Sequence, residues 1–187
     1  MNIIETKSIS KIILNEKTPE REQRFEHYLI PYYQRGYRWE IENVKALLDD
    51  IHNFINSKEE FYCLQPIVVV PNLDENGDRI WEVIDGQQRL TTLYIIFKYL
   101  GISKYTILFE ERALSNDFLK NLNHETYNHS NPDFHFMSEA YKCVKEWFEN
   151  KTKNEMGYVF SFVARLTKDV QGIWYQIKKI KKIEEEE

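Results

Sequence analysis

The chain has 187 residues, enough for a single domain with a buried core that needs neither a disulfide nor a metal for stability. Its net charge of −5 is atypical of a general nucleic-acid-binding protein, so any DNA contact would have to use a local basic patch. The sequence contains neither a hydrophobic leader nor an apolar run of membrane-spanning length, so we expect a cytoplasmic protein without a membrane partner.

The first part of the chain predicts a long helix after two less regular segments. Residues 2–14 alternate weakly between apolar and polar types, which fits either a strand or a short helix. A charged stretch over 16–27 is expected as loop or exposed helix. One proline and one glycine favour irregular structure over 29–39. Apolar residues then recur every three or four positions and predict an amphipathic helix over 41–55.

The middle of the chain predicts a β-hairpin followed by a helix. Residues 62–70 are rich in β-forming types, and Pro66 within them suggests an edge strand or a strand start. The composition of residues 72–78 is typical of a hairpin turn, after which residues 79–84 would form the returning strand. A helix is predicted over 89–100.

The last part of the chain predicts mostly helices. Ser138 is the predicted N-cap of a helix that runs through Trp147 and Phe148. The other expected elements are a strand at 105–109, a short helix at 113–122, a polar loop at 123–134, a helix near 155–167 and a strand at 170–177. We therefore predict an α+β fold in one domain over 1–187, sheet-rich to about residue 110 and mainly helical from about residue 111.

The most informative stretch joins an apolar strand to a helix and reads Val83-Ile-Asp-Gly-Gln-Gln-Arg-Leu-Thr-Thr-Leu93. A strand that turns directly into a helix leaves the first helical N–H groups without intrahelical partners. Those N–H groups, the helix dipole and Arg89 would favour phosphate, and Gly86 would let the backbone approach it. Asp85 could hold a divalent cation such as Mg²⁺, or orient an attacking water.

Further residues of this stretch support two interpretations. Thr91 and Thr92 lie in the first helical turn and could offer a hydroxyl to phosphate or to metal-bound water. In a purely structural interpretation, Asp85 caps the helix and pairs with Arg89. The two adjacent glutamines argue against that interpretation, because amides have little structural reason to be consecutive where a helix begins.

A second cluster interleaves aromatic residues with arginines over Tyr32-Tyr-Gln-Arg-Gly-Tyr-Arg-Trp39. Such rings could stack on bases while the arginines pair with phosphates, which predicts DNA contacts by Tyr33, Tyr37, Arg38 and Trp39. The alternative is a loop whose aromatic residues cover the core and whose arginines are solvated.

The cysteines and histidines show no pattern of a metal site. Cys63 and Cys143 lie in apolar contexts and are expected to be buried free thiols in a reducing compartment. His124 and His129 lie in a polar loop without a surrounding ligand set, and His135 between two phenylalanines is expected to be packed and hydrogen-bonded. The chain also lacks the glycine-rich phosphate loops, which excludes a conventional P-loop NTPase.

Together the two clusters resemble the signatures of one family, the N-terminal domain of GmrSD-type restriction endonucleases. The first signature corresponds to Ile30–Trp39, and the second, the Asp-Gly-Gln-Gln-Arg box, to Asp85–Leu93. The similarity spans about residues 20–178, with looser agreement at Leu64–Val70, Asp133–Met137 and Trp174–Tyr175.

This resemblance implies a fold similar to the ParB and sulfiredoxin class, whose corresponding strand–turn–helix holds nucleotide phosphates. Family members are linked to nucleotide hydrolysis that licenses cleavage of modified phage DNA. Many relatives also carry an HNH-type nuclease domain, for which this chain has no comparable residues. Because the chain ends at Glu187, we expect either a truncated protein or one that works with a separate nuclease subunit.

The resulting hypothesis is a nucleotide-binding, NTP-hydrolysing sensor domain of a modification-dependent restriction system that uses an NTP with Mg²⁺. Asp85, Gln88 and Arg89 would act in catalysis. The expected nucleotide-binding residues are Gly86, Gln87, Thr91 and Thr92 from the box, with Gln34 and Arg35 facing it across the site. Two alternatives stay open: a non-catalytic module that recognises modified DNA, and a ParB-like nuclease.

Overall fold

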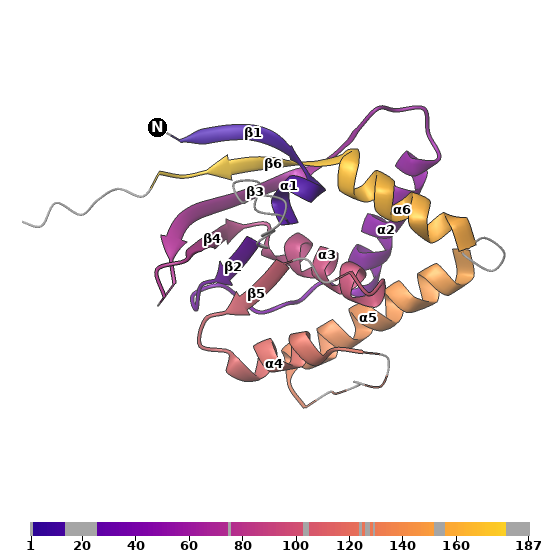
Figure 1. Ribbon diagram of the computed structural model, residues 1–187. Coiled ribbons are helices and arrows are strands. Elements are labelled where there is room, and N and C mark those ends of the chain that lie inside the picture. Colours follow the sequence, from indigo (N-terminus) through magenta and orange to yellow (C-terminus); the bar gives the residue numbers. More distant parts are fainter. Residues whose placement is uncertain are drawn as a thin grey trace, which may run out of the picture.

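The computed structural model describes residues 2–13, 26–74, 76–102, 105–123, 125, 128, 130–151 and 156–178. Within these residues the strands are β1 (Ile3–Ser8), β2 (Glu26–Ile30), β3 (Tyr62–Leu73), β4 (Arg79–Asp85), β5 (Tyr105–Phe109) and β6 (Val170–Gln176). The helices there are α1 (Ile9–Ile13), α2 (Ile41–Ile55), α3 (Gln87–Tyr99), α4 (Ala113–Asn121), α5 (Pro132–Lys151) and α6 (Met156–Lys168) (Figure 1).

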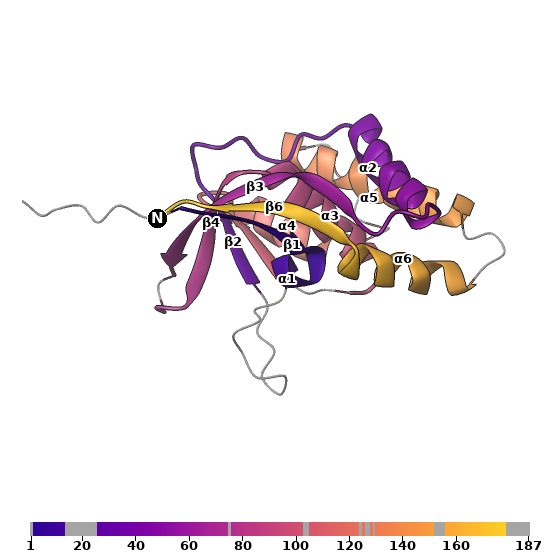
Figure 2. The same cartoon turned by 90° about the horizontal axis from the view of Figure 1, so that it is seen from above.

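The strands form one mixed sheet in the order β1-β6-β3-β4-β2-β5. β6 pairs with β1 antiparallel and with β3 parallel, so the last strand of the chain lies between two earlier ones. β3 and β4 form an antiparallel hairpin, and β2 runs parallel to both β4 and β5. Figure 2 shows β1, β6 and β3 side by side, with α6 leading directly into β6. β4 is therefore an interior strand, and its last residue is Asp85.

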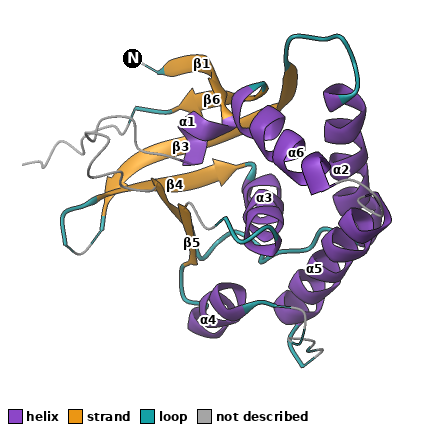
Figure 3. Cartoon of the chain, turned by 45° about the vertical axis from the view of Figure 1, so that its right-hand side comes forward, coloured by secondary structure: helices purple, strands orange, loops and turns teal. Residues whose placement is uncertain are grey.

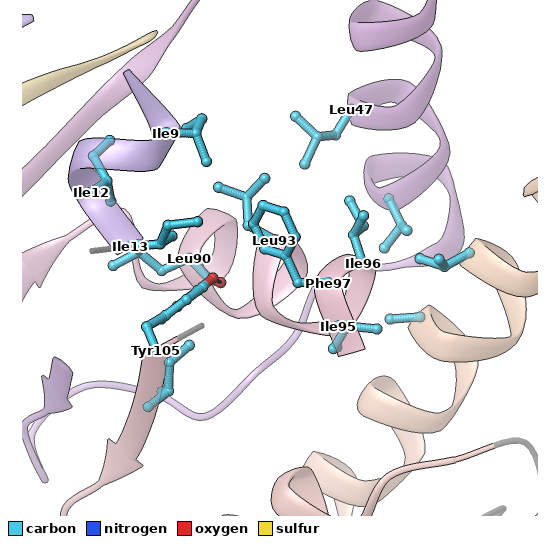
Figure 4. Packing of buried hydrophobic residues seen from close by; sticks show 14 of the residues in the cluster. Ile9, Ile12, Ile13, Leu47, Leu90, Leu93, Ile95, Ile96, Phe97 and Tyr105 are labelled. Atoms are coloured by element: carbon cyan, nitrogen blue, oxygen red, sulfur yellow. Dashed lines mark hydrogen bonds between the residues drawn. The ribbon is translucent and has the colours of Figure 1, made fainter. Parts of the chain in front are cut away.

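α3 is the central helix of the domain. Its buried residues point in all directions around the helix axis: Leu90, Thr91, Thr92, Leu93, Ile95, Ile96 and Phe97. Isoleucines of α1 lie on one side of it, Leu47 of α2 lies on the other, and Tyr105 of β5 packs beside it (Figure 4). A helix enclosed on all sides is held by its neighbours, so the turn at which α3 begins is held in place as well.

The remaining helices pack around α3 and against one another. α5 contacts α2, α3 and α4, while α6 contacts α1 and α2 (Figure 3). None of the helices in the described part of the chain combines the length and hydrophobicity that a membrane crossing requires.

Most predicted elements are confirmed, as is the α+β class. The helix at 41–55, the hairpin around 72–78, the strand at 105–109 and the C-terminal helix–strand pair are all present. Residues 2–14 satisfy both alternatives, because a strand passes directly into a short helix. The segment predicted at 16–27 lies mostly outside the described residues.

The edge position predicted from Pro66 is wrong. β3 lies between β6 and β4 in the interior of the sheet. Pro66 falls where the register between β3 and β6 shifts, between Leu64 and Ile67. A bulge leaves a residue outside the hydrogen-bonded ladder, so the missing N–H of proline is tolerated there.

One strand and the starts of two helices also differ from the prediction. The strand Glu26–Ile30 was missed, because its first residues resemble the charged segment before it. α3 begins at Gln87, earlier than predicted. α5 begins at Pro132 rather than after Ser138, because Asn131 Oδ1 accepts the N–H of Asp133 at 2.8 Å and proline suits the first helical position.

Candidate functional site

The turn between β4 and α3 requires glycine for two reasons. Gly86 has a φ of 93° and a ψ of 4°, a left-handed conformation that side chains disfavour. A Cβ at this position would lie 3.1 Å from the carbonyl oxygen of Pro66 and 3.2 Å from the Cα of Ile67. The turn is therefore packed directly on the bulge of β3.

The amino end of α3 lacks a capping hydrogen bond from a side chain of the described residues. Gly86 is the N-cap, no side chain of the described residues caps the helix, and its first backbone bond joins Leu90 N–H to Gly86 O at 3.0 Å. The preceding N–H groups and the helix dipole therefore favour an anion at this turn. Asp85 is exposed and does not cap the helix. The capping role in the structural interpretation is thus wrong.

Arg89 is directed toward β3. Its Nη1 donates to the carbonyls of Pro66 (2.6 Å) and Gln65 (3.3 Å), and its Nη2 donates to Gln65 Oε1 (2.8 Å). Among the described residues Arg89 forms no ion pair with Asp85. Burial lowers the pKa of Arg89, and the negative charge of Asp85 partly opposes this shift. An arginine remains protonated under such conditions, so a half-buried positive charge lies close to the turn.

The loop over residues 31–40 lies against this turn. Gln34 Nε2 donates to the carbonyls of Val83 (2.7 Å) and Ile84 (2.9 Å) at the end of β4. Gln88 Oε1 accepts the N–H of Arg38 at 2.8 Å, and Gln88 Nε2 donates to Gly36 O at 3.0 Å. The structure thus joins the two clusters that the sequence places far apart.

The two glutamines of the box differ in their surroundings. Both polar ends of the Gln88 side chain bind the loop backbone, which supplies a structural reason for one of the two amides. The Oε1 atom of Gln87 is buried and has no hydrogen-bond partner in the described part of the chain. The sequence argument for paired functional amides therefore no longer needs Gln88, and a functional role of Gln87 stays a prediction.

Two of the residues predicted to contact DNA are engaged inside the protein. Tyr37 is fully buried, and its hydroxyl lies 2.9 Å from Thr92 Oγ1. Arg38 pairs with the buried Asp133 and donates to Tyr37 O at 2.6 Å. Neither side chain is free to contact DNA in this conformation.

Other side chains of the same loop are exposed. Tyr32 and Tyr33 are 62% and 59% exposed and meet edge to face, and Tyr33 OH donates to Glu82 Oε1 at 3.2 Å. Arg35 is exposed and forms no hydrogen bond or ion pair with the residues that the structure describes. The part of the loop open to a ligand is therefore its tip.

The threonines of the box are buried. Thr91 Oγ1 donates to Gln87 O and Thr92 Oγ1 to Gln88 O, each at 2.9 Å. Hydroxyls bound to their own helix and shielded from solvent do not reach a phosphate at the turn. Neither threonine hydroxyl is therefore available to a ligand in this conformation.

A pocket of about 230 Å³ connects the end of the aromatic loop with the end of the box. Its lining comes from α2, β3 and both clusters: Trp39, Asn43, Ala46, Leu47, Asp50, Tyr62, Cys63, Leu64, Gln65 and Arg89. Pockets for drug-sized ligands measure roughly 300–1,000 Å³, so this one suits a smaller group such as a nucleobase.

The cysteines and histidines agree only in part with the sequence analysis. Cys143 is buried as predicted, whereas Cys63 is exposed at the wall of this pocket. The ring of His135 packs edge to face on Phe136, while His124 and His129 lie outside the described residues. No group of three or more metal-binding side chains occurs in the described part of the chain.

The comparison with known families decides the identity of the domain. The sequence model of the GmrSD restriction endonuclease N-terminal domain matches residues 9–187. The chain belongs to this family. No curated protein matches it. Membership places the domain among components of restriction systems, for which DNA and a nuclease are consistent partners.

Two residues that contact the candidate site carried no individual signal in the sequence. Gln65 receives the guanidinium of Arg89, and Asp133 from α5 pairs with Arg38. Asp133 lies in a segment of loose family similarity, which was the available hint. Contacts between segments this far apart appear only when the chain is folded.

Proposed function

We propose that this GmrSD domain binds a nucleoside triphosphate at the turn between β4 and α3 and hydrolyses it. It would thereby act as the nucleotide-responsive part of a modification-dependent DNA restriction system. The observation that carries the proposal is the uncapped start of α3 beside two charges, the half-buried Arg89 and the exposed carboxylate of Asp85.

The phosphates would bind the N–H groups at the start of α3, since both these donors and the helix dipole attract anions. Gly86 allows the left-handed turn with which α3 begins, and Arg89 supplies positive charge while its N–H groups hold β3. Arg35, exposed at the tip of the opposite loop, would add a second cation. The pocket between Trp39 and Arg89 would receive the base.

Mg²⁺ fits this site only as a partner of the nucleotide. Asp85 is a single exposed carboxylate, and Mg²⁺ commonly binds proteins through one or two carboxylates together with substrate phosphates. When bound, the ion would neutralise phosphate charge and polarise a water. Gln87, whose buried Oε1 has no partner in the described part of the chain, would orient a polar group of the ligand.

Steady-state hydrolysis tests the proposal. Turnover of each of the four common NTPs with Mg²⁺ is compared for the wild type, Asp85→Asn, Arg89→Gln and the control Asp117→Asn, an exposed carboxylate on α4. Removing a charged group that stabilises the transition state lowers the rate by about a hundredfold, and the control should keep wild-type turnover. Hydrolysis that is absent, or equal in all four proteins, contradicts the enzymatic assignment.

Binding can be measured independently through Cys63. Because this thiol lines the pocket and is exposed, a bound nucleotide should slow its alkylation severalfold, whereas the buried Cys143 should be unreactive with or without nucleotide. A non-hydrolysable NTP analogue is the probe. Equal alkylation rates with and without saturating analogue place the nucleotide elsewhere.

A second candidate function is DNA binding by the tip of the loop. The exposed pair Tyr32 and Tyr33, next to the exposed Arg35, presents rings and a charge suited to stacking and phosphate contact. Salt-dependent affinity for modified DNA that falls in Tyr33→Ala, without any NTP binding, would favour this function over the first. Metal-dependent nicking of plasmid DNA that is lost in Asp85→Asn would instead favour the nuclease alternative.

A further inference from the structure

A buried carboxylate lies behind the loop that covers the box. Asp133, in the first turn of α5, is 1% exposed. Its oxygens accept hydrogen bonds from Ser115 Oγ (2.7 Å), Arg112 Nη1 (3.3 Å) and Arg38 Nη1. Asp133 therefore joins α5 to the start of α4 and to the loop over residues 31–40.

The surroundings of Asp133 keep it ionised. Burial alone would raise its pKa, but the hydrogen bonds from Ser115 and Arg38 and the charges of Arg38 and Arg112 outweigh burial and lower the pKa of this carboxyl. A buried ion pair that loses one partner leaves an uncompensated charge. The ion pair with Asp133 consequently holds Arg38, and with it the loop over residues 31–40, in place.

The loop backbone packs directly on this carboxylate. A Cβ built on Gly36 would lie 2.1 Å from Asp133 Oδ1 and 2.6 Å from its Cγ, so only glycine permits the contact. Gly36 O and the N–H of Arg38 are the two backbone groups that hold the side chain of Gln88. A continuous set of contacts thus runs from Asp133 through Gly36 and Arg38 to the box.

We propose that Asp133 is a positioning residue, which holds the loop over residues 31–40 against the box without touching the ligand. Its effect on nucleotide affinity rests on the proposed function, whereas its effect on the loop does not. The loop carries Gln34, Arg35 and Trp39, so a loop that moves away from Gln88 takes these groups away from the turn.

Hydrogen exchange tests the positioning role without any ligand. In Asp133→Asn the N–H of Arg38 should exchange about tenfold faster, while the N–H groups of β3 and β4 keep their protection. The matched control is Glu26→Gln. Glu26 is also buried and paired, with Arg79 Nη2 at 2.6 Å and Trp81 Nε1 at 2.9 Å, but at the opposite end of β4. This control should leave exchange in the loop unchanged.

Nucleotide affinity then tests the consequence. Measured with the non-hydrolysable NTP analogue, it should fall about tenfold in Asp133→Asn and stay at the wild-type value in Glu26→Gln. In a Gln88→Ala background, Asp133→Asn should lower affinity much less, because the contact through which it acts is already gone. Independent effects in this double variant would show that Asp133 only stabilises the fold and would overturn the proposal.

The outcomes separate the two proposals. A wild-type protein that binds no analogue contradicts the proposed function, while the exchange result still decides the positioning role. Unchanged exchange at Arg38 in Asp133→Asn, or equal acceleration in Glu26→Gln, overturns the positioning role even if nucleotide binds.

Discussion

Gly86→Ala should destabilise the domain by about 2–5 kcal/mol, because the added methyl group both strains the backbone and overlaps with neighbouring atoms. The left-handed backbone, with a φ of 93°, costs a residue with a Cβ about 1–2 kcal/mol. The methyl group would also lie 3.1 Å from Pro66 O and 3.2 Å from Ile67 Cα. Both atoms belong to the backbone of an interior strand, so relieving the overlap costs about 1–3 kcal/mol more.

Gly77→Ala separates the two costs. Gly77 lies in the β3–β4 hairpin turn with a φ of 80°, and a Cβ there would have nothing within 4 Å. This variant should therefore show only the backbone cost of about 1–2 kcal/mol. Urea denaturation of the wild type and both variants at one pH gives the three free energies of unfolding. Equal losses in the two variants would refute the argument that the box packs tightly on β3.

Three further predictions concern titration and reactivity. With a disulfide reagent at pH 8, native protein should react at Cys63 and not at Cys143, because burial raises the pKa of Cys143 to about 11. Reaction of both thiols before unfolding would contradict this prediction. The pKa of Asp133 is lowered in the folded state, so its stabilising effect is present above the ordinary aspartate pKa and lost as the pH falls below it. The gap in unfolding free energy between wild type and Asp133→Asn should therefore narrow from pH 5 to pH 3, and a constant gap would argue against an ionised Asp133. Burial and the charge of Lys151 lower the pKa of His52 in the folded protein. Because the unfolded chain then binds the proton at a higher pH than the folded protein, the free energy of unfolding should fall as the pH drops below about 6.5. Urea midpoints from pH 7.5 to pH 5.5 should show a drop that is smaller in His52→Gln.

Local patterns predicted most of the fold. The helix at 41–55 and the hairpin around 72–78 follow from periodicity and turn composition, which act over a few residues. The interior position of β3 could not be predicted, because it depends on β6 arriving from the far end of the chain. Pro66 was misleading for this reason, since a bulge removes its usual penalty.

In the candidate site, too, local features could be predicted from the sequence and long-range contacts could not. The box was found from residue types alone, because a strand, a glycine and a helix start in succession are a local arrangement. The roles of single side chains were less predictable. Tyr37 and Thr92 are sequestered together in the core, and Gln88 serves the loop backbone, because segments distant in sequence pack around them.

The sequence by itself determined that a strand turns near Gly86 into a helix whose first N–H groups lack intrahelical partners, since the backbone chemistry of neighbouring residues decides these features. Only the tertiary structure decided which side chains face that start. It turned Arg89 toward β3, left Asp85 exposed and placed Asp133 behind the loop. The physical reason is that the burial and the hydrogen-bond partners of a side chain depend on which distant segments pack against it. That packing is determined by the folding of the whole chain and not by neighbouring residues.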